Sequence, residues 1–318
     1  MDLSAERWEG VTAAERGFLA ASLAKQLPSG FTFQAIRRFL FGEWQHHVAL
    51  YQKDSATFAL IPGKAVLLGY QADRRWEPNP DELESWQATS DKYGIGKTIR
   101  QYIAEVTLPV RRVELSPFLI ETAAGELGWE PIGIDDPEVQ GILREYPTQG
   151  QVELSRGGTS TRVRREQNKI LAERSLSSTH ADLAAQIAKT GFHFPTSDEW
   201  EYACGGGTPT LFRWGDHVPC DRYPTDISPA EAAWRRQWVL SAGILKRPAE
   251  GFASDWDYHR QPNGFGLLIA SDPYKYELMA EIGVTRGGDG GCTICGGAGF
   301  FMGWLTLATA YFEEHSCK

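Results

Sequence analysis

The sequence has little of what marks nucleic-acid-binding, membrane-spanning or secreted proteins. Its 32 Lys and Arg are outnumbered by 41 Asp and Glu, which leaves a formal charge of −9. Nucleic acids and anionic membranes attract a basic surplus, so we expect neither as a partner. No apolar run approaches the roughly 20 residues that cross a bilayer, and the first ten residues lack the basic and apolar regions of a secretory signal. We therefore expect a cytoplasmic protein.

Cysteine is scarce, and the histidines do not cluster. An odd number of cysteines in a long chain argues against a disulfide framework, and they are Cys204, Cys220, Cys292, Cys295 and Cys317. The sequence has no H-x3-H-x-E iron motif. His46 and His47 are adjacent, so a strand points them to opposite faces and a helix separates them by about 100°. The histidines therefore do not predict a shared metal ion.

Glycine and tryptophan are plentiful instead. The 318 residues include 33 Gly and 11 Trp, which predicts a substantial core together with many turns. We expect an α+β fold with little regular sheet. Residues 1–54 are interpreted as an N-terminal helical segment, with helices at 11–26 and 32–41. Residues 55–318 are expected to form one further domain.

Hydrophobic periodicity predicts the remaining elements. Short apolar or alternating runs within 44–71 and 108–122 are typical of strands. The apolar segment 296–318 is expected to form a buried pair of strands. Polar composition or helical periodicity predicts surface loops at 80–91 and 150–166 and helices at 95–106 and 167–190.

A helix is also predicted inside the most distinctive stretch of the chain, residues 191–216. Thr196 and Glu199 have capping-box spacing, so the helix should begin at Ser197. Three consecutive glycines end it, and a tight aromatic turn follows at 213–216. None of these residues is arranged as a nucleophile with its base, so this stretch is expected to be structural.

Residues 194–216 resemble the formylglycine-generating enzyme (sulfatase-modifying factor) family, whose pattern is close to F-R-L-P-T-E-x-E-W-E-Y-A-A-R-G-G followed by W-G-[DN]. Three further stretches are similar in the same order. They are residues 58–69 (F-x-M-I-P-G-G-x-F-x-M-G in the family), 113–120 (H-x-V-x-L-x-x-F-x-I), and 263–267 with 286–288 (N-x-F-G-L and L-R-G-G). The resemblance implies a decorated C-type-lectin-like α+β domain.

The resemblance also implies a copper site after Arg286. Family members that oxidise a substrate cysteine bind copper(I) through two cysteines, the first of them six residues after this arginine, as Cys292 is. The second lies five residues further on in the family but three further on here, at Cys295. In the family mechanism the copper–thiolate centre binds the substrate thiolate, activates O2 and removes a hydrogen from the substrate's β-carbon. Asp289 stands where the family often has Ser, and would accept a proton or orient a water molecule.

The residues themselves leave three interpretations of the cysteine pair open. Two thiolates held close together favour a soft ion such as copper(I). The same pair could be half of a zinc site completed by His315 and Cys317. It could also be a buried or redox-active pair without a metal.

The resemblance further implies a calcium site, at Asn263 and Glu277 with Asp272 between them. The family pattern there is F-G-L-x-D-M-x-G-N-V-W-E-W, whereas this chain has FGLLIASDPYKYELM. Oxygen donors of this kind suit Ca²⁺, and the alternative is that they are ordinary acidic and polar surface residues.

Two functions follow as hypotheses. The first is a copper-dependent oxidase or oxygenase of the formylglycine-generating type that acts on a small thiol or a peptide. The second is a non-catalytic ligand-binding protein on the same scaffold, like the variable receptors made by diversity-generating retroelements. An accessory structural role remains a third, because a fold alone does not choose among them.

Overall fold

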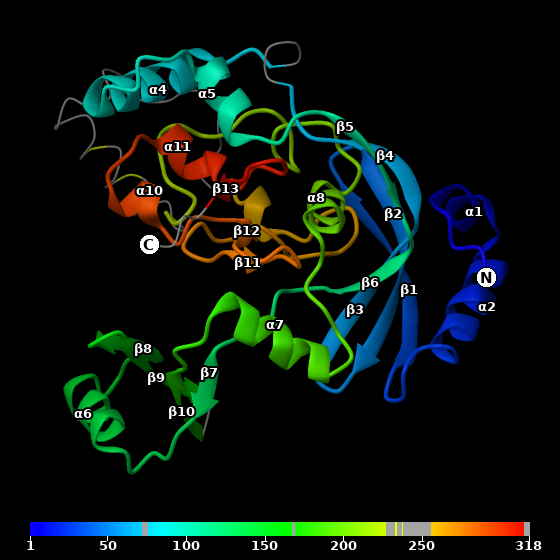
Figure 1. Cartoon of the computed structure of the whole chain (residues 1–318), viewed down its shortest axis with the longest axis horizontal. Coiled ribbons are helices and arrows are strands. Elements are labelled where there is room, and N and C mark those ends of the chain that lie inside the picture. Colours follow the sequence, from blue (N-terminus) through cyan, green and yellow to red (C-terminus); the bar gives the residue numbers. More distant parts are fainter. Residues whose placement is uncertain (72–75, 167–168, 227–232, 234–236, 238–255, 315–318) are drawn as a thin grey trace. The chain divides into compact units, whose positions relative to one another are not determined.

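The computed structural model of the chain describes residues 1–71, 76–166, 169–226, 233, 237 and 256–314 (Figure 1). It contains helices and antiparallel sheets, so the α+β prediction is confirmed. The expectation of little regular sheet is wrong, because two four-stranded sheets are present. Contacts separate a larger unit, Met1–Ala124 with Pro195–Lys318, from a smaller one, Gly125–Phe194. The sequence did not predict this insertion. The boundary expected after residue 54 is wrong, because it falls between two paired strands of one sheet.

The larger unit holds most of the elements. Its helices are α1 (Ala5–Gly10), α2 (Ala13–Ala24), α4 (Pro80–Tyr93), α5 (Ile99–Val106), α8 (Ser197–Gly205), the 3-10 helix η1 (Tyr258–Arg260), α10 (Cys292–Cys295) and α11 (Phe300–Leu305). Its strands are β1 (Thr32–Phe41), β2 (Trp44–Lys53), β3 (Ala56–Ile61), β4 (Lys64–Leu68), β5 (Arg111–Leu115), β6 (Phe118–Glu121), β11 (Glu277–Leu278), β12 (Val284–Arg286) and β13 (Glu313–Glu314).

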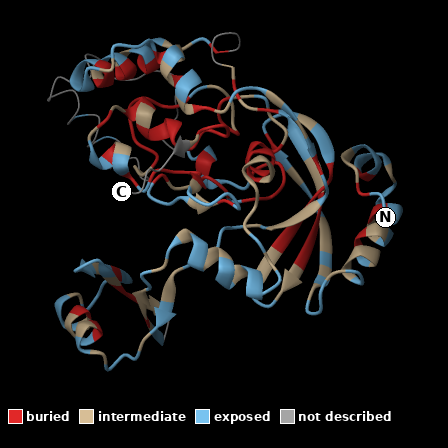
Figure 2. Ribbon diagram, in the orientation of Figure 1, coloured by how far each residue is buried: buried red, intermediate tan, exposed pale blue. Residues whose placement is uncertain are grey.

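The principal sheet, in the order β1-β2-β3-β6, has α1 and α2 on one side and α8 on the other (Figure 1). Alternate residues of β2 point to opposite faces, as the strand repeat requires. Leu50 packs in the core that contains Trp200 of α8. The neighbouring Tyr51 is also buried, and its hydroxyl donates to the Ala20 carbonyl of α2 at 3.0 Å. Figure 2 shows the buried residues concentrated on this sheet and on α8 and α11.

The helix predicted at 32–41 is wrong, because these residues form β1. Phe33, Ile36 and Leu40 have helical spacing, but the segment pairs along its length with β2, with an irregularity between Phe33 and Ala35. The hairpin supplies backbone partners for both strands, and aromatic and β-branched residues suit a half-buried sheet. Pairing with a neighbouring segment therefore overrode the local periodicity.

The loop predicted at 80–91 is also wrong, because these residues belong to α4. Asn79 caps the helix by accepting from the Glu82 N–H at 2.9 Å, while the Glu82 carboxylate accepts from the Asn79 N–H at 2.8 Å. Pro80 stands at the first helical position, which its fixed φ favours. Trp86 is buried in a second core, together with Trp304 of α11. The acidic composition suggested a surface loop, although the segment contains the capping residues of a helix.

The C-terminal segment was expected as a strand pair, and its main element is instead α11. Phe300, Phe301 and Trp304 of this helix are fully buried, so the segment is in the core as expected. The backbone of Glu313–Glu314 then forms β13 beside β12.

The smaller unit contains β7 (Trp129–Pro131), α6 (Pro137–Glu145), β8 (Gln151–Arg156), β9 (Thr159–Glu166), β10 (Lys169–Ser175) and α7 (His180–Lys189). Its sheet has the order β7-β10-β9-β8. One face packs on α6 through Val139, Ile142, Val152, Val163 and Ala172. The loop predicted at 150–166 is therefore wrong, and the helix predicted at 167–190 is α7 preceded by β10, with residues 167–168 outside the described part.

Several local predictions are confirmed. Capping boxes at Thr12 and Thr196 open α2 and α8, and Gly206 ends α8 in the left-handed conformation. The strands expected within 44–71 and 108–122 are present as β2 to β6. Within the described part of the chain, none of the helices combines the length and the apolar character needed to cross a membrane.

Candidate functional site

The two candidate cysteines occupy the first and last positions of α10. Cys292 and Cys295 are both exposed and both free thiols. Residues three apart lie on the same side of a helix, about 5–6 Å apart at Cβ. The structure therefore brings the two side chains to one side of a single helical turn.

The turn before α10 is anchored by Arg286, the arginine of the R-G-G motif. Arg286 is completely buried and donates to Ser197 Oγ at 2.7 Å and to the Tyr311 carbonyl at 2.9 Å. Its guanidinium also lies 3.3 Å from a carboxylate oxygen of Glu201. Burial lowers the pKa of Arg286 from its ordinary value, and the negative charge of Glu201 opposes that shift. The arginine thus joins the strand before the thiol pair to α8 and to the C-terminal segment.

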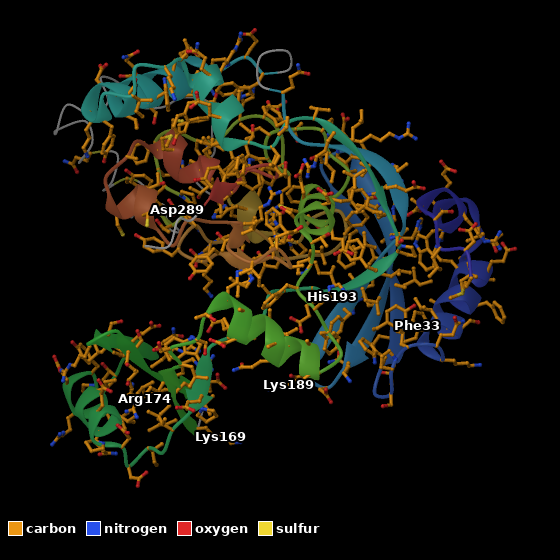
Figure 3. The ribbon with its side chains drawn as sticks, in the orientation of Figure 1. Phe33, Lys169, Arg174, Lys189, His193 and Asp289 are labelled. Carbon is orange, nitrogen blue, oxygen red and sulfur yellow. The ribbon has the colours of Figure 1, made fainter. Side chains whose placement is uncertain are left out.

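Asp289, which we expected to accept a proton or to orient a water molecule, makes hydrogen bonds with the backbone around α10. It is buried at the start of the turn into α10 (Figure 3). One carboxylate oxygen accepts from the Gly291 N–H and the other from the Thr293 N–H, both at 2.8 Å. Because both oxygens already accept backbone hydrogen bonds, the carboxylate shapes the turn that presents Cys292.

The donor set fits a soft ion with few ligands. Two exposed thiols suit copper(I), which thiolates prefer over harder cations. In the part of the chain that the structure describes, no three His, Cys, Asp or Glu side chains gather as a metal site. A tetrahedral zinc ion would need two more ligands. His315 and Cys317, which were considered for that role, lie outside the described residues.

The residues expected to bind calcium are engaged in hydrogen bonds within the protein. The Asn263 amide donates to the carbonyls of Ala203 at 2.7 Å and Cys204 at 2.9 Å. Its oxygen accepts from the N–H groups of Phe265 and Leu267, so the side chain ties the end of α8 to the 263–267 loop. Asn263 is therefore a structural residue, and the calcium prediction for it is not supported by this arrangement.

Glu277 and Asp272 also have internal partners. The half-buried Glu277 carboxylate accepts from Trp200 Nε1 at 2.7 Å and from the Ala270 N–H at 3.0 Å. Burial raises the pKa of Glu277 above its ordinary value. Asp272 accepts from the Tyr274 N–H at 3.0 Å.

The remaining cysteines and the histidine pair have separate environments. Cys204 and Cys220 are buried, which raises the pKa of the Cys204 thiol to about 12 and that of Cys220 well above its ordinary value. His46 Nε2 lies 2.9 Å from the Gly206 carbonyl, whereas His47 Nδ1 lies 2.8 Å from a Glu9 carboxylate oxygen. His46 Nδ1 also lies 3.9 Å from the other Glu9 carboxylate oxygen, so the two histidines share Glu9 as a neighbour.

The sequence did not identify Tyr274, which lies beside the thiol pair. Its hydroxyl oxygen is 3.3 Å from Cys295 Sγ, although 21 positions separate the two residues. No motif links these positions, so only the folded chain shows the contact.

The chain was also compared with known proteins. No protein-family model and no curated protein matches it. The resemblance to the formylglycine-generating enzymes therefore depends on the short motifs quoted above.

Proposed function

We propose that this chain is a copper-dependent oxidoreductase of the formylglycine-generating type that uses O2 to oxidise a small thiol or a peptide. The observation that supports the proposal is the exposed thiol pair, Cys292 and Cys295, on one side of α10. Two thiolates can hold a copper(I) ion, which can then accept the thiolate of a substrate as a third ligand.

The chain's own residues would hold the site in place. When bound by the two thiolates, copper(I) supplies a centre that binds a further thiolate and passes electrons to O2. Arg286 fixes the strand that leads to the site, and Asp289 fixes the turn from which Cys292 projects. The exposure of both cysteine residues allows a substrate to approach them.

The C-type-lectin-like fold and the cytoplasmic location are part of the same proposal. The fold is supported by the sequence motifs and by their positions in the larger unit, where α8 packs on the principal sheet and the R-G-G turn contacts α8. A reducing compartment would keep the exposed cysteines as thiols, as copper(I) binding requires.

Anaerobic titration with copper(I) against a chromogenic chelator tests the metal site. We expect one equivalent to bind to the reduced protein and binding to be lost in Cys292→Ser and Cys295→Ser. Thr293→Ser is the matched control, because Thr293 lies on the same helix turn and carries no thiol. Equal binding by the double cysteine variant and the wild type would overturn the proposed site.

Oxygen consumption tests the reaction. With copper and a cysteine-containing peptide or small thiol, the wild type should consume O2 faster than either cysteine variant. Copper binding without any thiol-dependent O2 consumption would contradict the oxidase and leave a metal-binding protein.

The exposed tyrosines around α10 favour a second candidate, the non-catalytic ligand-binding protein. Tyr93, Tyr274 and Tyr276 are each 44–52% exposed. Their rings or hydroxyls reach the turn that carries the thiols. Tyrosine supplies recognition surface at low entropic cost. If this candidate is correct, ligand binding persists in the Cys292→Ser/Cys295→Ser double variant.

A further inference from the structure

A tight turn at residues 272–276 is joined to the backbone that precedes the thiol pair. The Pro273 carbonyl accepts from the N–H of Asp289 at 3.2 Å and from that of Gly291 at 3.0 Å. A Cβ atom at Gly288 would lie 1.8 Å from the Lys275 carbonyl oxygen, so only glycine permits this approach. The turn and the start of α10 therefore form one closely packed piece of backbone.

Tyr274 projects from this turn across the start of α10. Its N–H donates to Asp272 Oδ1 at 3.0 Å, which fixes the backbone beneath the side chain. A Cβ atom on Gly291 would lie 2.3 Å from the tyrosine ring, so the ring occupies the space that a side chain there would need. The hydroxyl oxygen then reaches Cys295 Sγ at 3.3 Å.

The neighbouring exposed tyrosines make different contacts. The Tyr93 hydroxyl donates to the carbonyl of Gly296, just after α10. The Tyr276 ring faces Gly290, 3.8 Å from the position of a Cβ atom there. These two residues therefore contact the backbone on either side of the thiols, whereas the Tyr274 hydroxyl contacts a sulfur atom.

We propose that Tyr274 is the positioning residue of the thiol pair, and that its hydroxyl donates to Cys295 Sγ when this sulfur is a metal-binding thiolate. A thiolate has no proton to donate, so the tyrosine O–H must be the donor in that state. Such a bond restricts Cys295 Sγ to one rotamer before the metal arrives, which reduces the entropic cost of binding. This inference rests on the proposed function, because it assigns a ligand-orienting role at the proposed copper site.

Tyr274→Phe tests the role of the hydroxyl, because it keeps the ring on Gly291 and removes only the donor. One hydrogen bond is worth about 2- to 10-fold in affinity, so copper(I) should bind the variant about 2- to 10-fold more weakly. The ultraviolet thiolate-to-copper charge-transfer band should also shift. If Tyr274 had only a structural role, this band would stay unchanged in the variant. Tyr276→Phe is the matched control, and we expect less than a 2-fold change in it. Unchanged affinity and an unchanged band in Tyr274→Phe would overturn the inference.

The metal-free protein separates failure of this inference from failure of the proposed function. Iodoacetamide alkylation at neutral pH, followed by peptide mass spectrometry, gives separate rates for Cys295 and Cys292. Loss of the hydroxyl that lies 3.3 Å from Cys295 Sγ should change the rate of alkylation of Cys295 relative to Cys292 in Tyr274→Phe, because the hydroxyl restricts the orientation of this sulfur atom. If the wild type binds no copper(I), the proposed function fails, yet this relative rate still decides the role of Tyr274. An equal ratio in wild type and variant would overturn that role.

Discussion

At the scale of single residues, polar side chains in this protein are more often structural than the motifs suggest. Asn263 looks like a calcium ligand in the sequence, yet all of its hydrogen-bonding groups face the protein's own backbone. Buried polar groups are stable only when they are paired in this way. The residue type alone did not show that the side-chain atoms of Asn263 already form hydrogen bonds with the backbone.

Asn263→Ala should destabilise the protein without changing any response to calcium. The substitution leaves the carbonyls of Ala203 and Cys204 and two loop N–H groups without their partner, so we expect the free energy of unfolding to fall by about 2–4 kcal/mol. Urea denaturation with and without Ca²⁺ measures both effects. Calcium-dependent stabilisation of the wild type that disappears in the variant would contradict the structural role.

His259 predicts a pH dependence of stability. It is buried, its Nε2 donates to the Pro224 carbonyl at 2.9 Å, and burial lowers its pKa to about 4. Between that value and the ordinary histidine pKa near 6.5, the unfolded chain binds the proton more readily. Stability is therefore fully present above about pH 6.5 and is lost as the pH falls toward 4, by about 3 kcal/mol.

Urea denaturation at pH 7 and pH 4.5 measures this loss. His259→Gln retains a donor for the Pro224 carbonyl but does not titrate, so its loss of stability over the same interval should be smaller. Equal losses in the two proteins would show that other groups cause the acid sensitivity.

At the scale of elements, the short helix α10, which carries the two thiols, is stabilised by hydrogen bonds at both of its ends. The four residues of α10 are too few to form a helix alone. In an isolated turn the conformational entropy lost by the backbone exceeds the gain from one hydrogen bond. Asp289 accepts from the N–H of Gly291 just before the helix and from that of Thr293 within it. Tyr93 and Lys92 of α4 donate to the carbonyls of Gly296 and Gly297. The thiol pair therefore depends on contacts from outside its own helix.

Asp289→Ala should weaken both stability and copper(I) binding. Loss of a helix cap costs about 0.5–2 kcal/mol, and here the same groups orient Cys292. Asp289→Asn keeps one oxygen acceptor, so we expect a smaller loss of both. Urea denaturation and copper(I) competition measure the two effects, and full copper(I) binding by Asp289→Ala would contradict the positioning role.

At the scale of the whole molecule, the chain separates into two units with their own cores. The smaller unit packs its sheet on α6 through residues that all belong to Gly125–Phe194. Residues 123–127 and 188–191, near its two ends, are exposed. A core of its own in each unit is typical of separate domains.

Limited proteolysis should therefore cut first near residues 123–127 and 188–191. Exposed connecting segments enter a protease active site more readily than packed strands. Subtilisin digestion followed by intact-mass measurement should yield a resistant fragment close to residues 125–194. Early cleavage within β8 or β9 would contradict an independently packed unit.

The sequence by itself determined the local features that depend on a few neighbouring residues. Capping boxes predicted the starts of α2 and α8, and alternation predicted strands β2 to β6. The C-x-x-C spacing places both thiols on one side of any helix that includes them, and the segment does form the helix α10. These features follow from hydrogen bonds and side-chain periods within about ten residues.

Only the tertiary structure decided the features that need distant partners. Segment 32–41 became a strand because β2 pairs with it, and residues 151–166 became a hairpin because Val152 and Val163 pack on α6. Tyr274 reached Cys295 because two turns far apart in the chain share backbone hydrogen bonds. Burial and pairing energies of this kind depend on which segments meet, and that information is absent from any short stretch of sequence.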